Sequence, residues 1–383
     1  MTITEILSDE TLRNREFPIT RDRVFLGHAG VCPLPRRVAE AVGSYAAQCT
    51  LGDQEELFPD ARIQECRTLA ARLLKAQPEE IALVGPTSLA LSFVAGGLTF
   101  RKQRNILVYH NDYPSNVYPW MALAEQGVEV RYLNTRDLGV IRDVDVIGQI
   151  DENTSLVALA SCHFISGFRI DIEAIGKALR KRGILFCVDG IQTVGAFQTT
   201  VEHVDFLAAD SHKWLLGPSA AGILYVRKSV QDQLAPMVMG WHNVRCPNFV
   251  AGEDIVFRRD ARRYEAGSHN LLGLAGLKAS LELALELGVD NIAAELLRKR
   301  RFLVSALSGK GYEVVQAEVS DRNASGIVSF HRGDADLTEL HQTLARAHIT
   351  TSLRMDRAGR RYIRLSPHYY NSDAELDRLI QAL

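Results

Sequence analysis

The sequence lacks any long apolar run, since no stretch reaches the ~18 consecutive apolar residues that a membrane-spanning helix needs. The opening segment MTITEILSDETLRNREF also lacks the apolar core behind a basic start that marks a secretory signal. Net charge is small as well, at −2, which excludes a general electrostatic attraction to nucleic acid or anionic membranes. We therefore expect a soluble, cytoplasmic protein with no nucleic-acid partner and no membrane partner.

Cysteine and histidine do not form metal-binding patterns. The six cysteines include no C-x-x-C pair, and the eleven histidines form no H-x-x-x-H or H-E-x-x-H motif. Scattered cysteines of this kind are typical of reduced thiols in a cytosolic enzyme. The sequence therefore predicts no metal site and no disulfide framework.

Short apolar runs alternate with helix-like stretches from about residue 60 to residue 230. The runs are almost continuously apolar, which is typical of strands buried on both faces of a largely parallel sheet. The predicted strands are residues 80–85, 105–110, 128–133, 154–162, 183–189, 204–210 and 221–228. Residues 87–98 and 171–183 predict helices between them. The sequence thus predicts an open α/β sheet, mostly parallel and flanked by helices.

A different pattern follows. Residues 270–288 predict one long helix that ends at Gly288, and an amphipathic helix follows over 290–308. The strand-like segments YEVVQ, GIVSFH and YIRLSP then alternate with two more helical patterns. We therefore divide the chain into an N-terminal arm (1–20), a large domain (21–265) and a smaller C-terminal α+β domain that includes the long linking helix (266–383).

Polar residues follow several of the predicted strands. In open α/β sheets, ligands bind beyond the carboxyl ends of the strands, so these residues are the candidates for a site. They are Thr87, Ser88, Tyr113, Asp189, Gln192, Ser211, His212 and Lys213. Individually, Asp189 or the Thr87–Ser88 pair could simply cap a helix, and Tyr113 could be a core aromatic residue.

Together these residue types match the requirements of pyridoxal 5′-phosphate (PLP). A carboxylate at a strand end can keep a heterocyclic nitrogen protonated, and an aromatic ring can stack on the heterocycle. Hydroxyls and backbone N–H groups at a helix N-terminus can bind a phosphate. A lysine whose amine becomes neutral can form a Schiff base with the aldehyde, and the pyridinium ring then acts as an electron sink.

The segments VDGIQTVG (188–195) and SHKWLLGP (211–218) closely resemble those of the class V aminotransferase family. That family includes cysteine desulfurases, selenocysteine lyases, isopenicillin N epimerase and kynureninase, and the resemblance extends from residues 24–35 to 364–380. It implies a PLP-dependent enzyme of transferase fold type I. By this resemblance, Lys213 is the Schiff-base lysine and proton shuttle, Asp189 pairs with the pyridine nitrogen, and Gln192 donates to the ring's phenolate oxygen.

The same resemblance implies further roles. Tyr113 occupies the position that stacks on the cofactor ring, and the phosphate-binding positions are Thr87, Ser88, Ser211 and His212. The segment RRYEAGSHN (262–270) places Ser268 at the phosphate of a neighbouring subunit, which implies a homodimer with shared active sites. Arg364 matches the arginine that clamps the substrate carboxylate, with Arg360 or Arg361 as alternatives. His28 in the GHAG loop is a further candidate for substrate contact.

Two departures from the family pattern bear on the reaction. Persulfide-forming desulfurases carry a cysteine shortly before the carboxylate-binding arginine, whereas here no cysteine follows Cys246. Phe164 also stands where an asparagine would contact the ring. We therefore predict an enzyme acting on an amino acid by β-carbon chemistry, as a C–S lyase or desulfurase-like enzyme without a C-terminal persulfide cysteine. Transamination and epimerisation are the alternatives, and a non-catalytic scaffold is disfavoured because Lys213 and Asp189 are both present.

Overall fold

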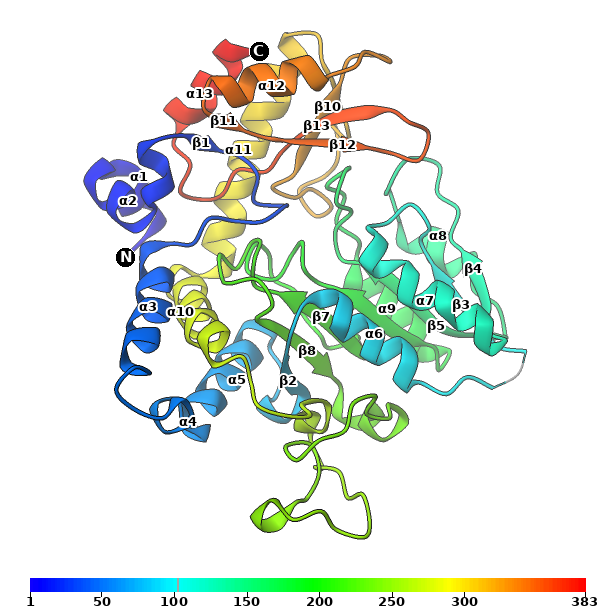
Figure 1. The fold of residues 1–383 in the computed structure, drawn as a ribbon. Helices are drawn as coiled ribbons and strands as arrows, with labels where there is room; N and C mark the ends of the chain where they lie inside the picture. The colour runs from blue at the N-terminus through cyan, green and yellow to red at the C-terminus, as the bar shows by residue number, and fades with distance from the viewer. Residues whose placement is uncertain (102) are drawn as a thin grey trace.

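The computed structural model describes residues 1–101 and 103–383. A seven-stranded sheet lies at the centre of the fold (Figure 1). All neighbouring strands are parallel except at β8, which runs antiparallel to both of its neighbours. In spatial order the strands are β2 (Ile81–Val84), β8 (Gly222–Val226), β7 (Phe206–Asp210), β6 (Leu185–Asp189), β5 (Thr154–Ala160), β3 (Asn105–Val108) and β4 (Glu129–Tyr132). The predicted α/β fold with a mostly parallel sheet is confirmed.

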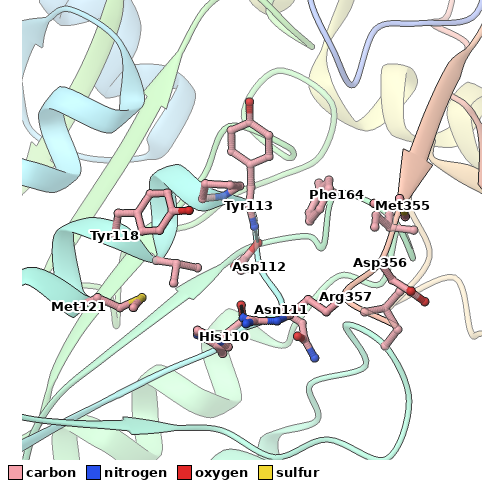
Figure 2. Close-up of a pocket in the computed structure, with 14 residues that line it drawn as sticks. His110, Asn111, Asp112, Tyr113, Tyr118, Met121, Phe164, Met355, Asp356 and Arg357 are labelled. Carbon is pink, nitrogen blue, oxygen red and sulfur yellow. Dashed lines mark hydrogen bonds between the residues drawn. The ribbon is translucent and has the colours of Figure 1, made fainter. Parts of the chain in front are cut away.

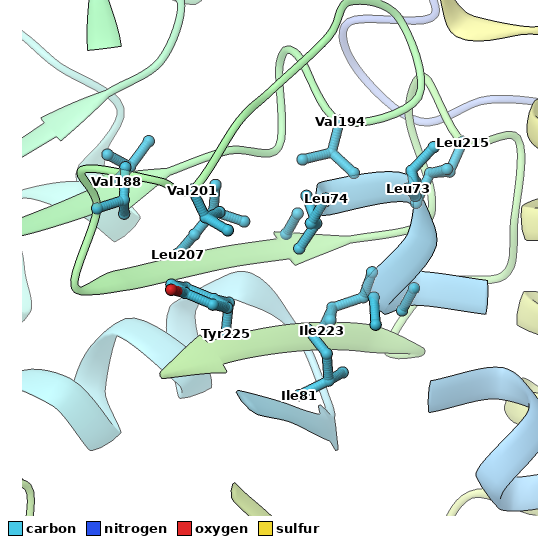
Figure 3. Packing of buried hydrophobic residues seen from close by; sticks show 14 of the residues in the cluster. Leu73, Leu74, Ile81, Val188, Val194, Val201, Leu207, Leu215, Ile223 and Tyr225 are labelled. Carbon is cyan, nitrogen blue, oxygen red and sulfur yellow. The ribbon is translucent and has the colours of Figure 1, made fainter. Parts of the chain in front are cut away.

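Helices cover both faces of this sheet, so successive residues of one strand enter different cores. In β5, Leu156 and Ala158 pack in the cluster that includes α6 (Thr87–Gly97) and α7 (Tyr118–Met121). Val157 and Leu159 pack in the opposite cluster, with α5 (Asp60–Leu74), α9 (Ile172–Lys181) and α10 (Leu271–Leu287). Figure 3 shows part of this second core, where Leu73 and Leu74 lie near the strand residues Ile223 and Ile81. Burial on both faces explains why the strands read as continuous apolar runs.

The helix boundaries follow from local capping chemistry. The side chain of Asp171 accepts a hydrogen bond from the Ala174 amide at the start of α9, and Arg180 and Lys181 lie in its last turn. Asn270 caps α10 in the same way. Gly288 ends α10 with a φ of 80°, a left-handed conformation that favours glycine. These ends match the predicted helices over 171–183 and 270–288.

A second, smaller sheet is built from the C-terminal part of the chain. It is antiparallel throughout, in the order β12 (Ser352–Met355), β13 (Arg361–Leu365), β10 (Val328–His331) and β9 (Glu313–Val314). The helices of this part are α11 (Val289–Gly309), α12 (Thr338–Arg346) and α13 (Asp373–Ala382). Near the N-terminus, β1 (Val24–Phe25) pairs in parallel with β11 (Ile349–Thr350). Residues close to both ends of the chain therefore lie side by side in the upper part of Figure 1.

The remaining helices lie mostly before the sheet in sequence. They are α1 (Ile3–Ser8), α2 (Glu10–Glu16), α3 (Arg36–Gln48), α4 (Gln54–Leu57) and α8 (Asp143–Ile147). Among the described residues, no helix combines the length and the apolar character needed to cross a membrane. The division at residues 20 and 265 stays a prediction, and many contacts cross it, since β1 pairs with β11 and α10 packs in one core with α5 and α9.

Candidate active site

A cavity of about 270 Å³ lies beyond the carboxyl ends of β6 and β7. This is the edge of the sheet at which the sequence predicts a site. The predicted residues that line the cavity are Thr87, Ser88, Tyr113, Asp189, Gln192, His212, Lys213 and Arg364. They come from five separate segments of the chain, and the fold brings them around one space.

Lys213 is buried in the cavity wall without a counter-ion. Its residue is 8% exposed, and within the described residues no hydrogen bond or ion pair involves its ammonium group. Burial lowers the pKa of Lys213 to about 8, opposed by the charge of Asp189, while Arg364 and Arg354 lower it further. The ammonium lies 5.4 Å from the centre of the Tyr113 ring. Near neutral pH a useful fraction of this amine is therefore neutral and nucleophilic.

Asp189 is the last residue of β6, and its carboxylate is buried. One oxygen accepts a hydrogen bond of 3.0 Å from the Ile191 amide. Burial raises the pKa of Asp189 to about 6, and the nearby Asp112 adds to the effect while Lys213 opposes it. Gln192 is held by its neighbours, because its amide oxygen accepts from the Trp214 indole at 2.8 Å and its amide nitrogen donates to the Ala29 carbonyl at 3.1 Å. The second N–H of that amide remains available to a ligand.

The cavity wall formed by the start of α6 carries groups that can bind an anion. Thr87 and Ser88 are the first two residues of α6, where backbone N–H groups have no partner within the helix. His212 completes this end, and its Nδ1 lies 2.8 Å from an Asp210 carboxylate oxygen. The Thr87 hydroxyl accepts a hydrogen bond from the Asp210 amide, which joins the start of α6 to the end of β7.

Two arginines line the cavity, and the sequence analysis identified only one of them. Arg364 on β13 donates to the Phe164 carbonyl at 2.8 Å, and its buried Nε has no partner among the described residues. Arg354 on β12 is the second, and neither arginine is paired with a described carboxylate. A Cβ atom on Gly30 would lie 3.7 Å from one guanidinium and 3.9 Å from the other. Burial and Arg354 lower the pKa of Arg364 to about 9. Two unpaired cations at one point favour an anionic ligand.

Tyr113 is oriented by a buried carboxylate, Asp112, to which the sequence analysis assigned no role. Asp112 accepts hydrogen bonds from the Tyr113 amide at 2.7 Å and from the Asn116 side chain at 3.0 Å. Burial raises the pKa of Asp112 to about 6. The Tyr113 ring meets the Phe164 ring edge-to-face, with centroids 5.5 Å apart. A recognisable signal for Asp112 existed in the sequence, since it directly precedes Tyr113 after a strand.

The structure does not bring three predicted residues to the cavity of this chain. The Ser211 hydroxyl donates to the Pro218 carbonyl, and the residue is fully buried behind the wall. His28 is also fully buried, where its ring nitrogens contact the Ser366 carbonyl and the Tyr370 hydroxyl. Ser268 is exposed near Glu55, away from the cavity. Arg361 contacts Asp336 and Thr338, so the alternative carboxylate site at Arg360 or Arg361 is not supported.

A sequence model of the family described as Aminotransferase class-V matches residues 24–379. The chain belongs to this family. A probable cysteine desulfurase from Methanothermobacter thermautotrophicus is 28% identical, over 96% of both chains. Among solved structures, the apo cysteine desulfurase from Thermococcus onnurineus has a TM-score of 0.88 at 23% identity, covering 96% of this chain and 95% of that one. A cystine C–S lyase bound to its product cysteine persulfide has a TM-score of 0.85 at 21% identity, covering 95% and 98%.

Membership of the class V family makes this chain a PLP-dependent enzyme, and the cavity fits that cofactor. The fit rests on the donor set: a buried carboxylate and a neutralisable lysine lie at one cavity with a helix N-terminus. The glycine at position 30 leaves open the space between these groups and the two arginines. The predicted fold type, cofactor and enzyme class are confirmed.

Proposed function

We propose that this enzyme cleaves the bond between the β-carbon and sulfur of cysteine or a cysteine derivative and releases the sulfur product. The observation that carries the proposal is the cavity itself. It combines a buried, unpaired lysine with two unpaired arginines, and no cysteine lines it among the described residues. Relatives named probable cysteine desulfurase, and a solved cystine C–S lyase of the same fold, support the same class of reaction.

The cofactor would be held by residues of three kinds. Asp189 would hold the pyridine nitrogen, and the second N–H of Gln192 would reach the phenolate oxygen. Tyr113 would cover one face of the ring. The phosphate would lie at the N-terminus of α6, near Thr87, Ser88 and His212. When bound through a Schiff base at an amine, PLP withdraws electrons from the bonds at the substrate's α-carbon.

This chain's own residues supply binding and proton transfer. Arg364 and Arg354 would bind the substrate carboxylate, since a guanidinium without a buried counter-ion gains most from an anionic ligand. Lys213 would then move the proton at the α-carbon, because its pKa of about 8 lies close to the working pH. Phe164 and Tyr113 would form one aromatic wall of the cavity beside the substrate.

The fate of the sulfur follows from where the thiols lie. Cys32 and Cys162 are buried behind the cavity, and burial raises the pKa of Cys32 to about 12 and that of Cys162 to about 11. A neutral, buried thiol does not attack sulfur. Because no cysteine lines the cavity among the described residues, we infer that the sulfur leaves as a free product, unlike in a desulfurase that keeps it as a persulfide on its own cysteine.

Assembly and location belong to the same proposal. Ser268 lies on the surface near Glu55, so it would reach a cofactor phosphate only in a second subunit, which supports a homodimer with shared sites. Scattered, unpaired thiols support a cytoplasmic location. We also retain the arm at 1–20 and the domains at 21–265 and 266–383 as a proposal.

The test is an analysis of products from PLP-loaded enzyme given L-cysteine, L-cystine and S-substituted cysteines. C–S lyase chemistry gives one pyruvate and one ammonium for each thiol or persulfide released. A desulfurase gives alanine in place of pyruvate. An aminotransferase requires an added oxo acid, and an epimerase changes only the optical rotation.

The control variant is Lys213→Ala, which we expect to bind PLP without covalent attachment and to release no product. Borohydride treatment followed by peptide mass spectrometry should place the cofactor on Lys213 of the unaltered enzyme alone. Products that keep the sulfur, as in transamination or epimerisation, or full turnover by the Lys213→Ala variant, would reject the proposal, whereas alanine in place of pyruvate would assign the desulfurase branch of the same bond cleavage.

A further inference from the structure

A second pocket shares a wall with the active-site cavity. Its volume is about 460 Å³, and Tyr113 and Phe164 line both spaces. These two rings meet edge-to-face and form the partition between them. Figure 2 shows this second pocket, with Tyr113 and Phe164 along one side and Met355, Asp356 and Arg357 beside Phe164. We call it the outer pocket.

Most of the outer pocket is apolar. Its apolar side chains come from four places: the segment around α7, the segment between β4 and α8, the loop after β5, and the end of β12. They are Val117, Tyr118, Met121, Leu138, Ile165 and Met355. Its polar residues are His110, Asn111, Asp112, Asp356 and Arg357, and the two carboxylates already accept hydrogen bonds within the chain. The pocket therefore suits a ligand part that is mainly apolar.

The rim of the outer pocket is fixed by contacts within the chain. The Arg357 guanidinium, from the turn between β12 and β13, donates to the His110 carbonyl at the end of β3, at 3.3 Å. Nδ1 of His110 is buried and has no partner among the described residues. Arg354 and Met355 are neighbours at the end of β12. The Arg354 side chain lines the active-site cavity, and the Met355 side chain lines the outer pocket.

The position of the carboxylate site connects the two spaces. Arg364 donates to the carbonyl of Phe164, which is itself part of the partition. A substrate whose carboxylate binds Arg364 therefore has its α-carbon next to the partition. Phe164 and Met355 also lie in the two segments where the sequence departs from the desulfurase pattern, and both side chains are apolar.

We propose that the outer pocket receives the leaving group of the substrate and that the substrates are cysteine S-conjugates with an aryl or long alkyl group on sulfur. This inference rests on the proposed C–S lyase function and narrows its substrate class. The Cβ–S bond of the conjugate breaks, and the sulfur leaves with the bonding electron pair and takes up a proton. The three-carbon remainder takes up water, so that R–S–cysteine and water give R–SH, pyruvate and ammonium.

The experiment compares S-benzyl-L-cysteine with S-methyl-L-cysteine on PLP-loaded enzyme, with pyruvate as the readout. We expect kcat/KM to be at least about 10-fold higher for the benzyl conjugate, since extra apolar groups are recognised on this scale. The variant Met121→Trp fills the outer pocket and should reduce the benzyl-to-methyl ratio by about 10-fold. Val144→Trp changes an exposed apolar residue of α8 that lines neither space, and it should leave the ratio unchanged.

A binding measurement separates this inference from the proposed function. Calorimetry with PLP-loaded Lys213→Ala enzyme should show at least about 10-fold tighter binding of the benzyl conjugate, and Met121→Trp in that background should remove the preference. If no conjugate releases pyruvate but the binding preference is present, the reaction has been assigned wrongly and the outer pocket stands. Equal binding of both conjugates, or a preference that survives Met121→Trp, overturns the inference.

Discussion

Two groups of buried cations in this protein have opposite surroundings. Lys299 is completely buried in α11, but its ammonium pairs with Glu295 and donates to the Tyr369 carbonyl. Arg67 is equally enclosed, and both of its terminal nitrogens contact the Glu265 carboxylate. Around the active-site cavity, by contrast, the described residues offer Lys213 no partner and leave both cavity arginines without a carboxylate.

The comparison shows how a fold can reveal a ligand site without a ligand. A buried charge is costly unless it is paired, and the cost is accepted for structure only where a partner is built in. Glu265 illustrates the paired case, since it also accepts hydrogen bonds from the Leu83 amide and His269, and the charge of Arg67 with these hydrogen bonds lowers the pKa of Glu265 to about 2. In the cavity, Lys213, Arg354 and Arg364 have no carboxylate partner among the described residues, so an anionic ligand would supply the missing negative charge.

The sharpest test exchanges one lysine from each group for methionine. Lys213→Met should lower turnover by about 10³-fold, because the group that moves the proton is lost. It should leave the thermal midpoint unchanged or slightly higher, since an unpaired buried cation is removed. Lys299→Met should have the opposite effect. It removes a paired ammonium, so the thermal midpoint should fall, while the protein that remains folded should keep its kcat. Steady-state kinetics and calorimetric melting of both variants check this, and equal loss of activity in the two would break the comparison.

The buried ion pair of Arg67 and Glu265 is tested by removing the charge of Glu265. Glu265→Gln leaves Arg67 buried without a counter-charge and should lower the free energy of unfolding by about 3 kcal/mol. Urea titration monitored by fluorescence measures the change. Glu282→Gln is the matched control, because it removes one half of an exposed pair with Lys278 and should cost about 0.5 kcal/mol. A cost for Glu265→Gln as small as that of the control would contradict the structural role assigned to the cluster.

The smallest effect concerns pH. The neutral amine of Lys213 attaches PLP, so the attachment rate of apoprotein should rise about tenfold per pH unit and level off above pH 8. The lowered pKa also means that the unfolded chain binds more protons between pH 8 and about 10.5, so this lysine makes folding more favourable as pH rises through that window. Borohydride trapping at timed intervals follows the rate. A rate that keeps climbing to pH 10 would show that Lys213 is no different from an exposed lysine.

Much of the sheet could be predicted from the sequence, for a clear physical reason. Strands buried on both faces carry few polar positions, which explains six of the seven predicted runs, and the seventh, the partly exposed edge strand β4, also lies within a few residues of its expected ends. Direction could not be read from the same runs. β8 is as apolar as β7, and it runs antiparallel to β7 because residues 211–221 form a loop without the crossover helix that a parallel connection would use.

The site divides along similar lines. Lys213, Asp189 and Gln192 stand in compact motifs next to strand ends, so local sequence was enough to propose them. Arg354 was missed because β12 is half-exposed and has no apolar pattern, and its place opposite Gly30 depends on how the smaller sheet packs. His28 was misjudged for the opposite reason, since a polar residue in a glycine-rich loop proves to be internal packing against Tyr370.

Asp210 gives the lysine loop a further property. Its carboxylate accepts hydrogen bonds from the amides of Ser211, Ala220 and Ala221, so one side chain closes both ends of the turn that carries Lys213. A loop fastened at its base has already lost its conformational entropy on folding. Lys213 is therefore already ordered before a ligand binds. No binding free energy is lost in ordering this loop, so the contacts with the ligand contribute fully to affinity.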